Sequence, residues 1–258
     1  MQYGICNLSI VPVRAEASDK AEIVTQLLFG DHFEVISTHK QWKKISTAFD
    51  KYIGYIDEKQ FLPIDQAEFN KLQTEPAIVC MDMIQVLVSE NQVFPLVIGS
   101  RLPFLKGNSF EIAGKSFQYE GHTRSLDMPV SDKKQVIENA FVYMNSPYLW
   151  GGRSPFGIDC SGLTQMAYKL SGVSLRRDAA QQAEQGMALN FLDEAEPGDL
   201  AFFDNAEGKV IHVGIILSGN QIIHSSGKVR VDKLDHHGIF NEEKKIYTHK
   251  LRVVKKIL

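Results

Sequence analysis

The hydrophobic pattern of this 258-residue sequence changes its period near Met128. Before Met128, apolar side chains recur in short runs separated by Gly, Asp and Pro, a pattern typical of short strands joined by turns. After Met128, the spacing first becomes helical and then returns to that of strands. Because helices followed by a run of antiparallel strands favour an α+β domain, we expect β-rich modules followed by one α+β domain.

The N-terminal half is predicted to contain two small β-barrels, because short strands at this spacing are typical of barrels. Residues 1–64 would form the first, with extended runs at Ile10–Arg14, Phe33–Ser37, Trp42–Ile45 and Tyr52–Ile56. Residues 65–76 are polar, and we expect them to be a linker with one or two helical turns. Residues 77–125 would form the second, with extended runs at Val86–Val88, Gln92–Val97, Phe104–Leu105 and Ser116–Tyr119.

Residues 128–258 are predicted to form the α+β domain. A first helix should begin at Ser131 or Asp132, and its apolar stripe should comprise Val136, Ala140, Phe141 and Met144. A second helix should run from Asp159 or Cys160 to about Leu170, and a third from about Asp178 to Gln185. The strands of this domain are expected at Leu200–Phe203, Val210–Leu217, Gln221–His224, Val229–Val231 and Leu251–Lys255.

Charge and composition exclude several classes of partner. A net charge of −3 offers no basic surface for nucleic acid or an anionic membrane. No apolar run approaches the roughly 18 residues of a membrane span, and the N-terminus lacks the regions of a signal peptide. We therefore expect a cytoplasmic protein, and as a separate expectation we take it to be a monomer. Three widely spaced cysteines argue against a disulfide framework, and Cys6 and Cys80 are interpreted as inert buried thiols.

Cys160 is the candidate nucleophile. It follows Asp159, a residue suited to cap a helix, and it precedes Ser161 and Gly162, whose N–H groups are expected near the sulfur as an oxyanion site. The N-terminus of a helix favours a thiolate through its N–H groups and its dipole. Considered alone, Cys160 also fits a small core residue, and the case for catalysis depends on two histidines.

His212 and His224 are the candidate base and its orienting partner. Alternation places His212 on one strand face with Gly214. A two-residue turn before His224 would put the two histidines on opposite faces. A three-residue Ser218–Asn220 loop would pair Gly214 with His224, so the histidines would be diagonal neighbours on one face. We expect that loop, or a bulge. A zinc site is the alternative use of these side chains, but neither Cys-x-x-Cys nor His-Glu-x-x-His spacing is present, and we expect neither metal nor cofactor.

Several motifs occur in an order typical of one enzyme family. They are Tyr148–Gly152, Asp159–Leu163, Arg176–Gln181, Pro197–Leu200 and the two histidine strands. With these motifs, residues 130–258 resemble the NlpC/P60 family of cysteine peptidases, which implies a papain-like catalytic domain. The two N-terminal modules resemble bacterial SH3 (SH3b) domains. The arrangement is most similar to the γ-D-glutamyl-L-diamino-acid endopeptidases of murein peptide recycling.

The resemblance implies cleavage of the amide between γ-D-Glu and a diamino acid in short murein peptides with a free N-terminal L-Ala. Asp178 would anchor the peptide amine, although it also fits a simple helix cap. Ser161 would hold the D-Glu carboxylate, and Ala179 departs from a serine found in relatives. The full set of implied substrate-binding residues is Tyr52, Asp178, Ser161, Asp159, Trp150, Ala179 and Asp31. Rival functions are an amidase or acyltransferase on the same scaffold, and a cell-wall-binding SH3b protein.

Overall fold

A computed structural model describes residues 2–90, 92–128 and 132–258. The chain divides into two compact units. The N-terminal unit extends to Met128 and also includes Trp150–Ser154, and the C-terminal unit comprises the remaining residues. No helix within the described ranges is long and apolar enough to span a membrane.

The first β module of the N-terminal unit is one antiparallel sheet in the order β3-β2-β6-β5-β4-β1-β7. Its strands are β1 (Gln2–Ile5), β2 (Ile10–Arg14), β3 (Ile23–Leu28), β4 (His32–His39), β5 (Trp42–Thr47), β6 (Ile53–Asp57) and β7 (Leu62–Ile64), and the 3-10 helix η1 (Glu58–Gln60) lies between the last two. All four extended runs predicted in this region overlap strands. Alternating apolar residues such as Val11, Val13 and Ile45 are fully buried inside the module.

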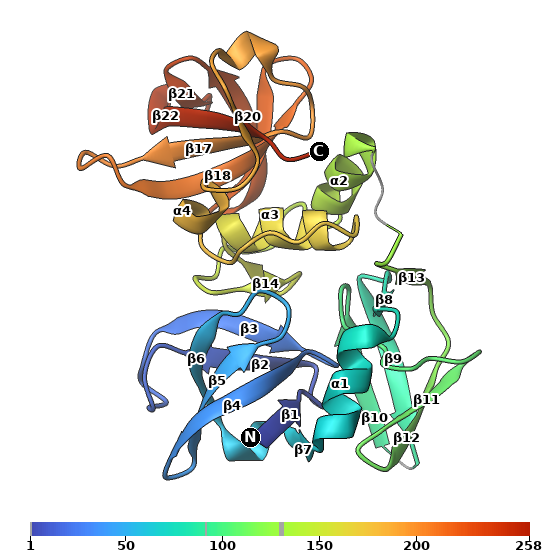
Figure 1. Cartoon of the computed structure of the whole chain (residues 1–258). Helices are drawn as coiled ribbons and strands as arrows, with labels where there is room; N and C mark the ends of the chain where they lie inside the picture. Colours follow the sequence, from blue (N-terminus) through green and yellow to red (C-terminus); the bar gives the residue numbers. More distant parts are fainter. Residues whose placement is uncertain (1, 91, 129–131) are drawn as a thin grey trace. The chain divides into compact units, whose positions relative to one another are not determined.

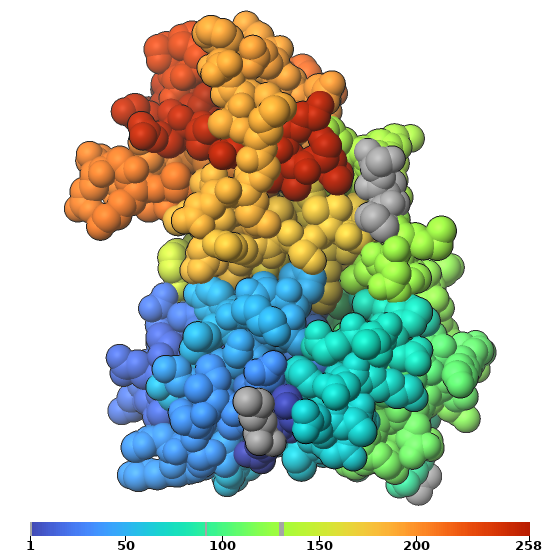
Figure 2. Space-filling model, in the orientation of Figure 1, coloured from blue at the N-terminus to red at the C-terminus, as the bar shows by residue number. Residues whose placement is uncertain are grey.

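The polar segment after this module is a packed helix, α1 (Gln66–Thr74), and so contributes more than the predicted linker. Asp65 caps it by accepting the Glu68 N–H at 2.7 Å. Phe69 and Leu72 are three residues apart, on the buried face of α1, and they join a core that residues of both β modules share. Figure 1 shows α1 between the two modules, and in Figure 2 the atoms of this segment lie at the surface between them.

The second β module contains a four-stranded sheet in the order β10-β9-β12-β11 and a ribbon of β8 and β13. The bounds are β8 (Ile78–Cys80), β9 (Ile84–Ser89), β10 (Gln92–Val97), β11 (Ser109–Ile112), β12 (Lys115–Tyr119) and β13 (Thr123–Ser125). The strand predicted at Phe104–Leu105 is wrong. Phe104 has a φ of 58°, a left-handed conformation that does not fit a strand.

Within the described residues, four helices and nine strands follow β13. The helices are α2 (Lys133–Phe141), α3 (Cys160–Lys169), α4 (Ala179–Gln182) and the 3-10 helix η2 (Leu192–Glu194). The strands are β14 (Arg153–Ser154), β15 (Gly157–Ile158), β16 (Met187–Leu189), β17 (Leu200–Asp204), β18 (Val210–Leu217), β19 (Gln221–Ser226), β20 (Lys228–Asp235), β21 (Gly238–Asn241) and β22 (Ile246–Lys256).

The C-terminal sheet has the order β16-β22-β17-β18-β19-β20-β21, and β22 also pairs with β21. Six strands therefore close into a barrel, and β16 extends it at β22. Phe203, Ile216 and Ile222 belong to its apolar core. Helix α3 packs against β18 and β19, and α2 packs against α3 (Figure 1).

The first helix of this unit differs in part from the prediction. Asp132 caps α2 by accepting the Lys134 N–H at 2.8 Å, whereas Ser131 lies outside the described residues. Val136 and Ala140 are fully buried, but Phe141, the last residue of the helix, is 42% exposed. The predicted stripe is therefore correct for Val136 and Ala140 and wrong for Phe141, and Met144 lies beyond the end of the helix.

Candidate active site

Cys160 is the first residue of α3, as the sequence predicts. Asp159 caps the helix, and its Oδ1 accepts the Gly162 N–H at 2.6 Å. Because the Gly162 N–H bonds to Asp159, it does not contribute to the predicted oxyanion site. The Cys160 sulfur instead receives the N–H groups of Ser161 and of Val213 on β18. The sulfur therefore lies beside the residue that follows His212 in the sequence.

Burial decides the ionisation of this cysteine in the resting protein. Cys160 is 6% exposed, and burial raises the pKa of its thiol to about 12, with the Asp159 charge adding to the rise. The N–H groups of Val213 and Ser161 act in the opposite direction, as does the Arg177 guanidinium. The sequence suggested a preformed thiolate, whereas these surroundings favour a neutral thiol that loses its proton only during the reaction.

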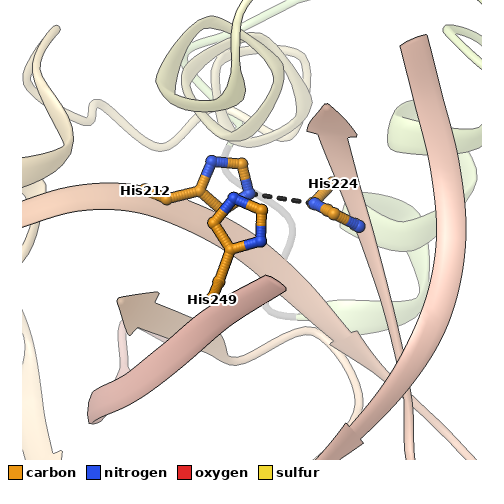
Figure 3. A group of neighbouring side chains, drawn as sticks. All are labelled: His212, His224 and His249. Carbon is orange, nitrogen blue, oxygen red and sulfur yellow. Dashed lines mark hydrogen bonds between the residues drawn. The ribbon is translucent and has the colours of Figure 1, made fainter. Parts of the chain in front are cut away.

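The two histidines meet in the register that the sequence predicts. Gly214 pairs with His224, and Leu217 pairs with Gln221, so Ser218–Asn220 forms a three-residue loop. Gly219 and Asn220 both have positive φ, which suits such a loop. The His212 Nε2 and His224 Nδ1 atoms lie 2.9 Å apart (Figure 3). Burial and the neighbouring histidines hold the pKa of His212 well below its ordinary value, so its imidazole is neutral at neutral pH.

A carboxylate that sequence reasoning missed lies behind His224. The Asp232 Oδ2 atom is 3.0 Å from His224 Nε2. Arg230 holds the same carboxylate, because its Nη2 donates to Oδ1 at 2.8 Å and its Nε lies 2.8 Å from Oδ2. The register pairs His224 with Arg230, so alternation along β20 places Asp232 on the same face. The predicted strand ended at Val231, and extending it by one residue would have placed Asp232 on this face.

His249 on β22 is the third histidine of this cluster, and it too was missed. Its ring stacks on that of His212, with centroids 4.1 Å apart and an interplanar angle of 24° (Figure 3). One nitrogen from each of His212, His224 and His249 lies within 4.8 Å of the others, as in a metal site. Lone pairs of imidazole lie in the ring plane, so two stacked rings direct them side by side rather than toward one ion. The cluster does not fit a metal site as it stands.

Arg177 organises the residues on either side of Cys160. It is 1% exposed, and its guanidinium donates to both carboxylate oxygens of Asp159, at 3.0 and 2.7 Å. It also donates to the Ser161 hydroxyl at 2.8 Å. Asp159 and Ser161, two of the predicted substrate-binding residues, therefore belong to a buried ionic cluster at the start of α3. The Arg-Arg-Asp motif contains Arg177, but its burial was not visible in the sequence.

Asp178 and Ala179 begin α4, immediately after Arg177. The Asp178 N–H donates to Gln181 Oε1 at 3.2 Å as part of a capping box. Asp178 is half-buried, and Ala179 is 8% exposed. The helix is shorter than predicted, since it ends at Gln182 rather than near Gln185. Capping and amine binding are compatible uses of the Asp178 carboxylate, and its predicted role in binding the substrate stays a prediction.

The remaining predicted contacts, Tyr52, Asp31 and Trp150, belong to the N-terminal unit. Tyr52 precedes β6, and its N–H donates to Thr47 Oγ1 at 2.9 Å. The Asp31 Oδ2 atom accepts the Leu28 N–H at 3.0 Å and lies 3.4 Å from Arg153 Nη1. An internal ion pair thus accounts for the burial of Asp31.

The indole of Trp150 belongs to the same segment as Arg153, and its Nε1 donates to Glu22. Arg153 itself donates to the Gln26 carbonyl at 2.8 Å. These bonds attach Trp150–Ser154 to the first β module. The predicted roles of Tyr52, Asp31 and Trp150 in substrate binding stay predictions.

Two family models match separate parts of the chain. Residues 145–248 match the NlpC/P60 family, and residues 13–61 match the bacterial dipeptidyl-peptidase SH3 domain. The γ-D-glutamyl-L-lysine dipeptidyl-peptidase of Bacillus subtilis is 31% identical over 220 residues, which cover 79% of this chain and 72% of that protein. Dipeptidyl-peptidase 6 of Lysinibacillus sphaericus is 28% identical over 255 residues, which cover 89% of this chain and 91% of that protein.

Solved structures share this fold. The crystal structure of an NlpC/P60 family protein from Bacillus cereus matches with a TM-score of 0.83 at 20% identity and covers 99% of both chains. An NlpC/P60 endopeptidase from Photobacterium damselae matches with a TM-score of 0.73 at 16% identity, covering 97% of this chain and 70% of that one. These matches confirm the predicted fold class, an α+β catalytic domain preceded by an SH3-like region.

Proposed function

Because the chain belongs to the NlpC/P60 family of cysteine peptidases, we propose that it hydrolyses the amide between γ-D-Glu and a diamino acid in short murein peptides with a free N-terminal L-Ala. The observation that carries the chemistry is the placement of Cys160 at the start of α3, bonded to the Val213 N–H beside the paired His212 and His224. Two relatives are named γ-D-glutamyl-L-lysine dipeptidyl-peptidases, and these names support the choice of substrate. We propose L-lysine as one diamino acid that this enzyme accepts.

The first half of the reaction transfers the dipeptidyl group to the enzyme. His212 Nε2 is engaged by His224, so Nδ1 is the nitrogen that takes the thiol proton. The Cys160 sulfur then attacks the γ-carbonyl of D-Glu and forms a C–S bond, and the carbonyl π electrons move to oxygen. When the tetrahedral intermediate collapses, the C–N bond breaks, and His212 gives its proton to the leaving amine of the diamino acid.

The second half regenerates the enzyme. A water molecule attacks the thioester carbonyl while His212 Nδ1 accepts one of its protons. The C–S bond then breaks, the proton returns to the Cys160 sulfur, and L-Ala-D-Glu leaves with a free γ-carboxyl group, which loses its proton to the solvent. Water is the only co-reactant, and the thiol and the imidazole end in the states in which they began.

Selectivity for a free amine is the part of the proposal that rests on Asp178. A half-buried carboxylate beside the Arg177 cluster is suited to pair with the ammonium of L-Ala. Tyr52, Trp150 and Asp31 are proposed as further contributors from the N-terminal unit, and Ser161 as the partner of the D-Glu carboxylate. Requirement for a free amine would restrict the enzyme to released peptides, so we propose a role in peptide recycling within the cytoplasm.

The test compares three substrates: L-Ala-γ-D-Glu-L-Lys, its N-acetylated form, and intact sacculi. We expect cleavage of the free tripeptide into L-Ala-D-Glu and L-Lys, slow or absent cleavage of the other two, and no product with Cys160→Ala. Absence of cleavage of the free tripeptide by the wild-type protein would refute the proposed function. Equal cleavage of the acetylated peptide would show that the protein is a peptidase that does not recognise the free amine.

The variant Asp178→Asn separates amine binding from helix capping, because asparagine caps helices about as well as aspartate. We expect kcat/KM for the free tripeptide to fall at least about tenfold, mainly through KM, with little change in thermal stability. Asp193→Asn, a change of an exposed carboxylate in η2, is the matched control and should behave as wild type.

A further inference from the structure

A continuous series of polar contacts runs from His212 to Arg230 through three neighbouring strands. His212 Nε2 lies 2.9 Å from His224 Nδ1, and His224 Nε2 lies 3.0 Å from Asp232 Oδ2. The ring of His224 is 1% exposed and Asp232 is 8% exposed, so little water competes for these contacts. Arg230 completes the series through its two contacts with the carboxylate.

The chemistry of Asp232 gives this series a direction. Burial acts to raise the pKa of this carboxyl, but hydrogen bonds from His224 and Arg230 outweigh burial and lower it. The carboxylate therefore only accepts, and the guanidinium of Arg230 only donates. The proton between His224 and Asp232 must then be carried by His224 Nε2.

The position of the proton on His224 determines the position of the proton on His212. A neutral imidazole has one N–H, so a neutral His224 that donates from Nε2 accepts at Nδ1. The partner of that Nδ1 is His212 Nε2, which must therefore carry the proton of its own ring. His212 Nδ1 is left as an unprotonated base, and this is the nitrogen that the proposed reaction needs.

We infer that Asp232, held in place by Arg230, is a positioning residue that fixes the tautomer of His212 through His224. The inference rests on the proposed function and deepens it. In serine peptidases a carboxylate fixes the tautomer of the base by direct contact. Here the carboxylate acts one residue further away, because a second histidine lies between it and the base. The same negative charge also stabilises the imidazolium that forms when His212 takes the thiol proton.

The variant Asp232→Asn tests this direction with minimal change of shape. When the asparagine oxygen keeps the bond from Arg230 Nη2, the NH₂ group replaces Oδ2 and faces both His224 Nε2 and Arg230 Nε, the second of which lies 2.8 Å from that position. His224 must then accept at Nε2 and donate from Nδ1, so His212 accepts at Nε2 and carries its proton on Nδ1. We expect kcat to fall about 10- to 100-fold while KM stays within about twofold.

The matched control is Asp235→Asn on the same strand. Asp235 is also a bonded carboxylate, but its partners are the Tyr247 hydroxyl and the N–H groups of His237 and Gly238. This variant removes the same charge from β20 without touching the histidine pair. Both kinetic constants should remain within about twofold of the wild type, as expected for a group outside the catalytic series.

Nitrogen-15 NMR of histidine-labelled protein reports the tautomer itself, which a purely structural role for Asp232 would not change. The His212 signals are assigned from the His212→Gln variant. We expect an Nε2–H tautomer in the wild type and an Nδ1–H tautomer in Asp232→Asn. A wild-type His212 with its proton on Nδ1 would overturn the inference, even if Asp232→Asn does not fold. A folded Asp232→Asn protein with unchanged kcat would overturn it as well.

The two measurements also separate this inference from the proposed function. The tautomer of wild-type His212 is measured without substrate, so it tests the effect of Asp232 even if the tripeptide is not cleaved. Conversely, normal cleavage by Asp232→Asn would leave the proposed function intact and remove only the positioning role.

Discussion

His32 of the N-terminal unit and His212 of the C-terminal unit are similar in burial but differ in their partners. They are 6% and 5% exposed, and burial is the main cause that lowers the pKa of each. His32 Nε2 lies 2.7 Å from the Gln73 amide, and Nδ1 lies 3.4 Å from Arg101. His212 Nε2 contacts a second histidine, and its backbone neighbour Val213 bonds the Cys160 sulfur.

The cysteines show the same contrast. Cys6 is fully buried, and its thiol donates to the Leu8 carbonyl at 3.3 Å, whereas the Cys160 sulfur accepts N–H groups beside the histidine pair. The two histidines and the two cysteines therefore do not differ in residue type, and all four are buried. The difference lies in whether the polar contacts end within the core or connect a nucleophile to a base. Substitutions in matched pairs test this difference.

Replacing the cysteines should give the largest contrast. We expect Cys160→Ala to lower kcat/KM by at least about 10⁴-fold, because no other group can form the thioester. Cys6→Ala should keep kcat/KM within about twofold and instead lower the free energy of unfolding by about 1–2 kcal/mol through the lost packing. Tripeptide hydrolysis and urea unfolding measure the two effects. Substantial residual hydrolysis by Cys160→Ala would show that the nucleophile is another residue.

The histidine pair should give the next largest contrast. His212→Gln should lower kcat by about 10³- to 10⁴-fold, because the thiol loses its proton acceptor. His32→Leu should leave kcat unchanged and lower the free energy of unfolding by about 1–3 kcal/mol, because Gln73 and Arg101 lose a buried partner. The contrast fails if His32→Leu reduces kcat in a protein that remains folded at the assay temperature.

Acid should destabilise both units through their buried histidines. Burial lowers the pKa of folded His32 to about 3 and that of His249 to about 4, both below the ordinary value of 6.5. Below pH 6.5 these histidines are protonated in the unfolded chain but stay neutral in the folded chain. The free energy of unfolding should therefore fall continuously from pH 6.5 toward pH 4. Urea midpoints across this range measure the loss. His32→Leu should show a shallower pH dependence, and a dependence as steep as that of the wild type would rule out His32 as a cause.

The smallest effect concerns the ionisation of Cys160. Because burial raises the pKa of its thiol to about 12, alkylation by iodoacetamide should accelerate continuously from pH 7 to pH 10. Mass-spectrometric mapping distinguishes Cys160 from Cys6 and Cys80. A rate that is already constant between pH 5 and pH 8 would indicate a thiolate–imidazolium pair in the resting enzyme.

The sequence was sufficient where short-range rules apply. The cap at Asp159 predicts the start of α3, and the length of the Ser218–Asn220 loop predicts the histidine register, which the structure confirms. Both follow from local geometry, since a helix cap and a hairpin loop involve residues that are close in the chain.

Long-range contacts account for what the sequence did not reveal. Arg177 is a charged residue that becomes buried only because Asp159 and Ser161 surround its guanidinium. His249 reaches His212 from β22, a strand distant in sequence. The polar composition of residues 65–76 predicts a linker, and only the core that Phe69 and Leu72 join shows that α1 is a packed helix.

Trapping of the acyl-enzyme tests the assignment of Cys160 as the nucleophile. Wild-type protein is mixed with L-Ala-γ-D-Glu-L-Lys, quenched in acid within the first turnover, digested and mapped by mass spectrometry. We expect an L-Ala-γ-D-Glu thioester on Cys160 in the wild type, and no thioester in Cys160→Ala. Release of L-Lys with a label on Cys6 or Cys80, or with no labelled cysteine at all, would contradict it.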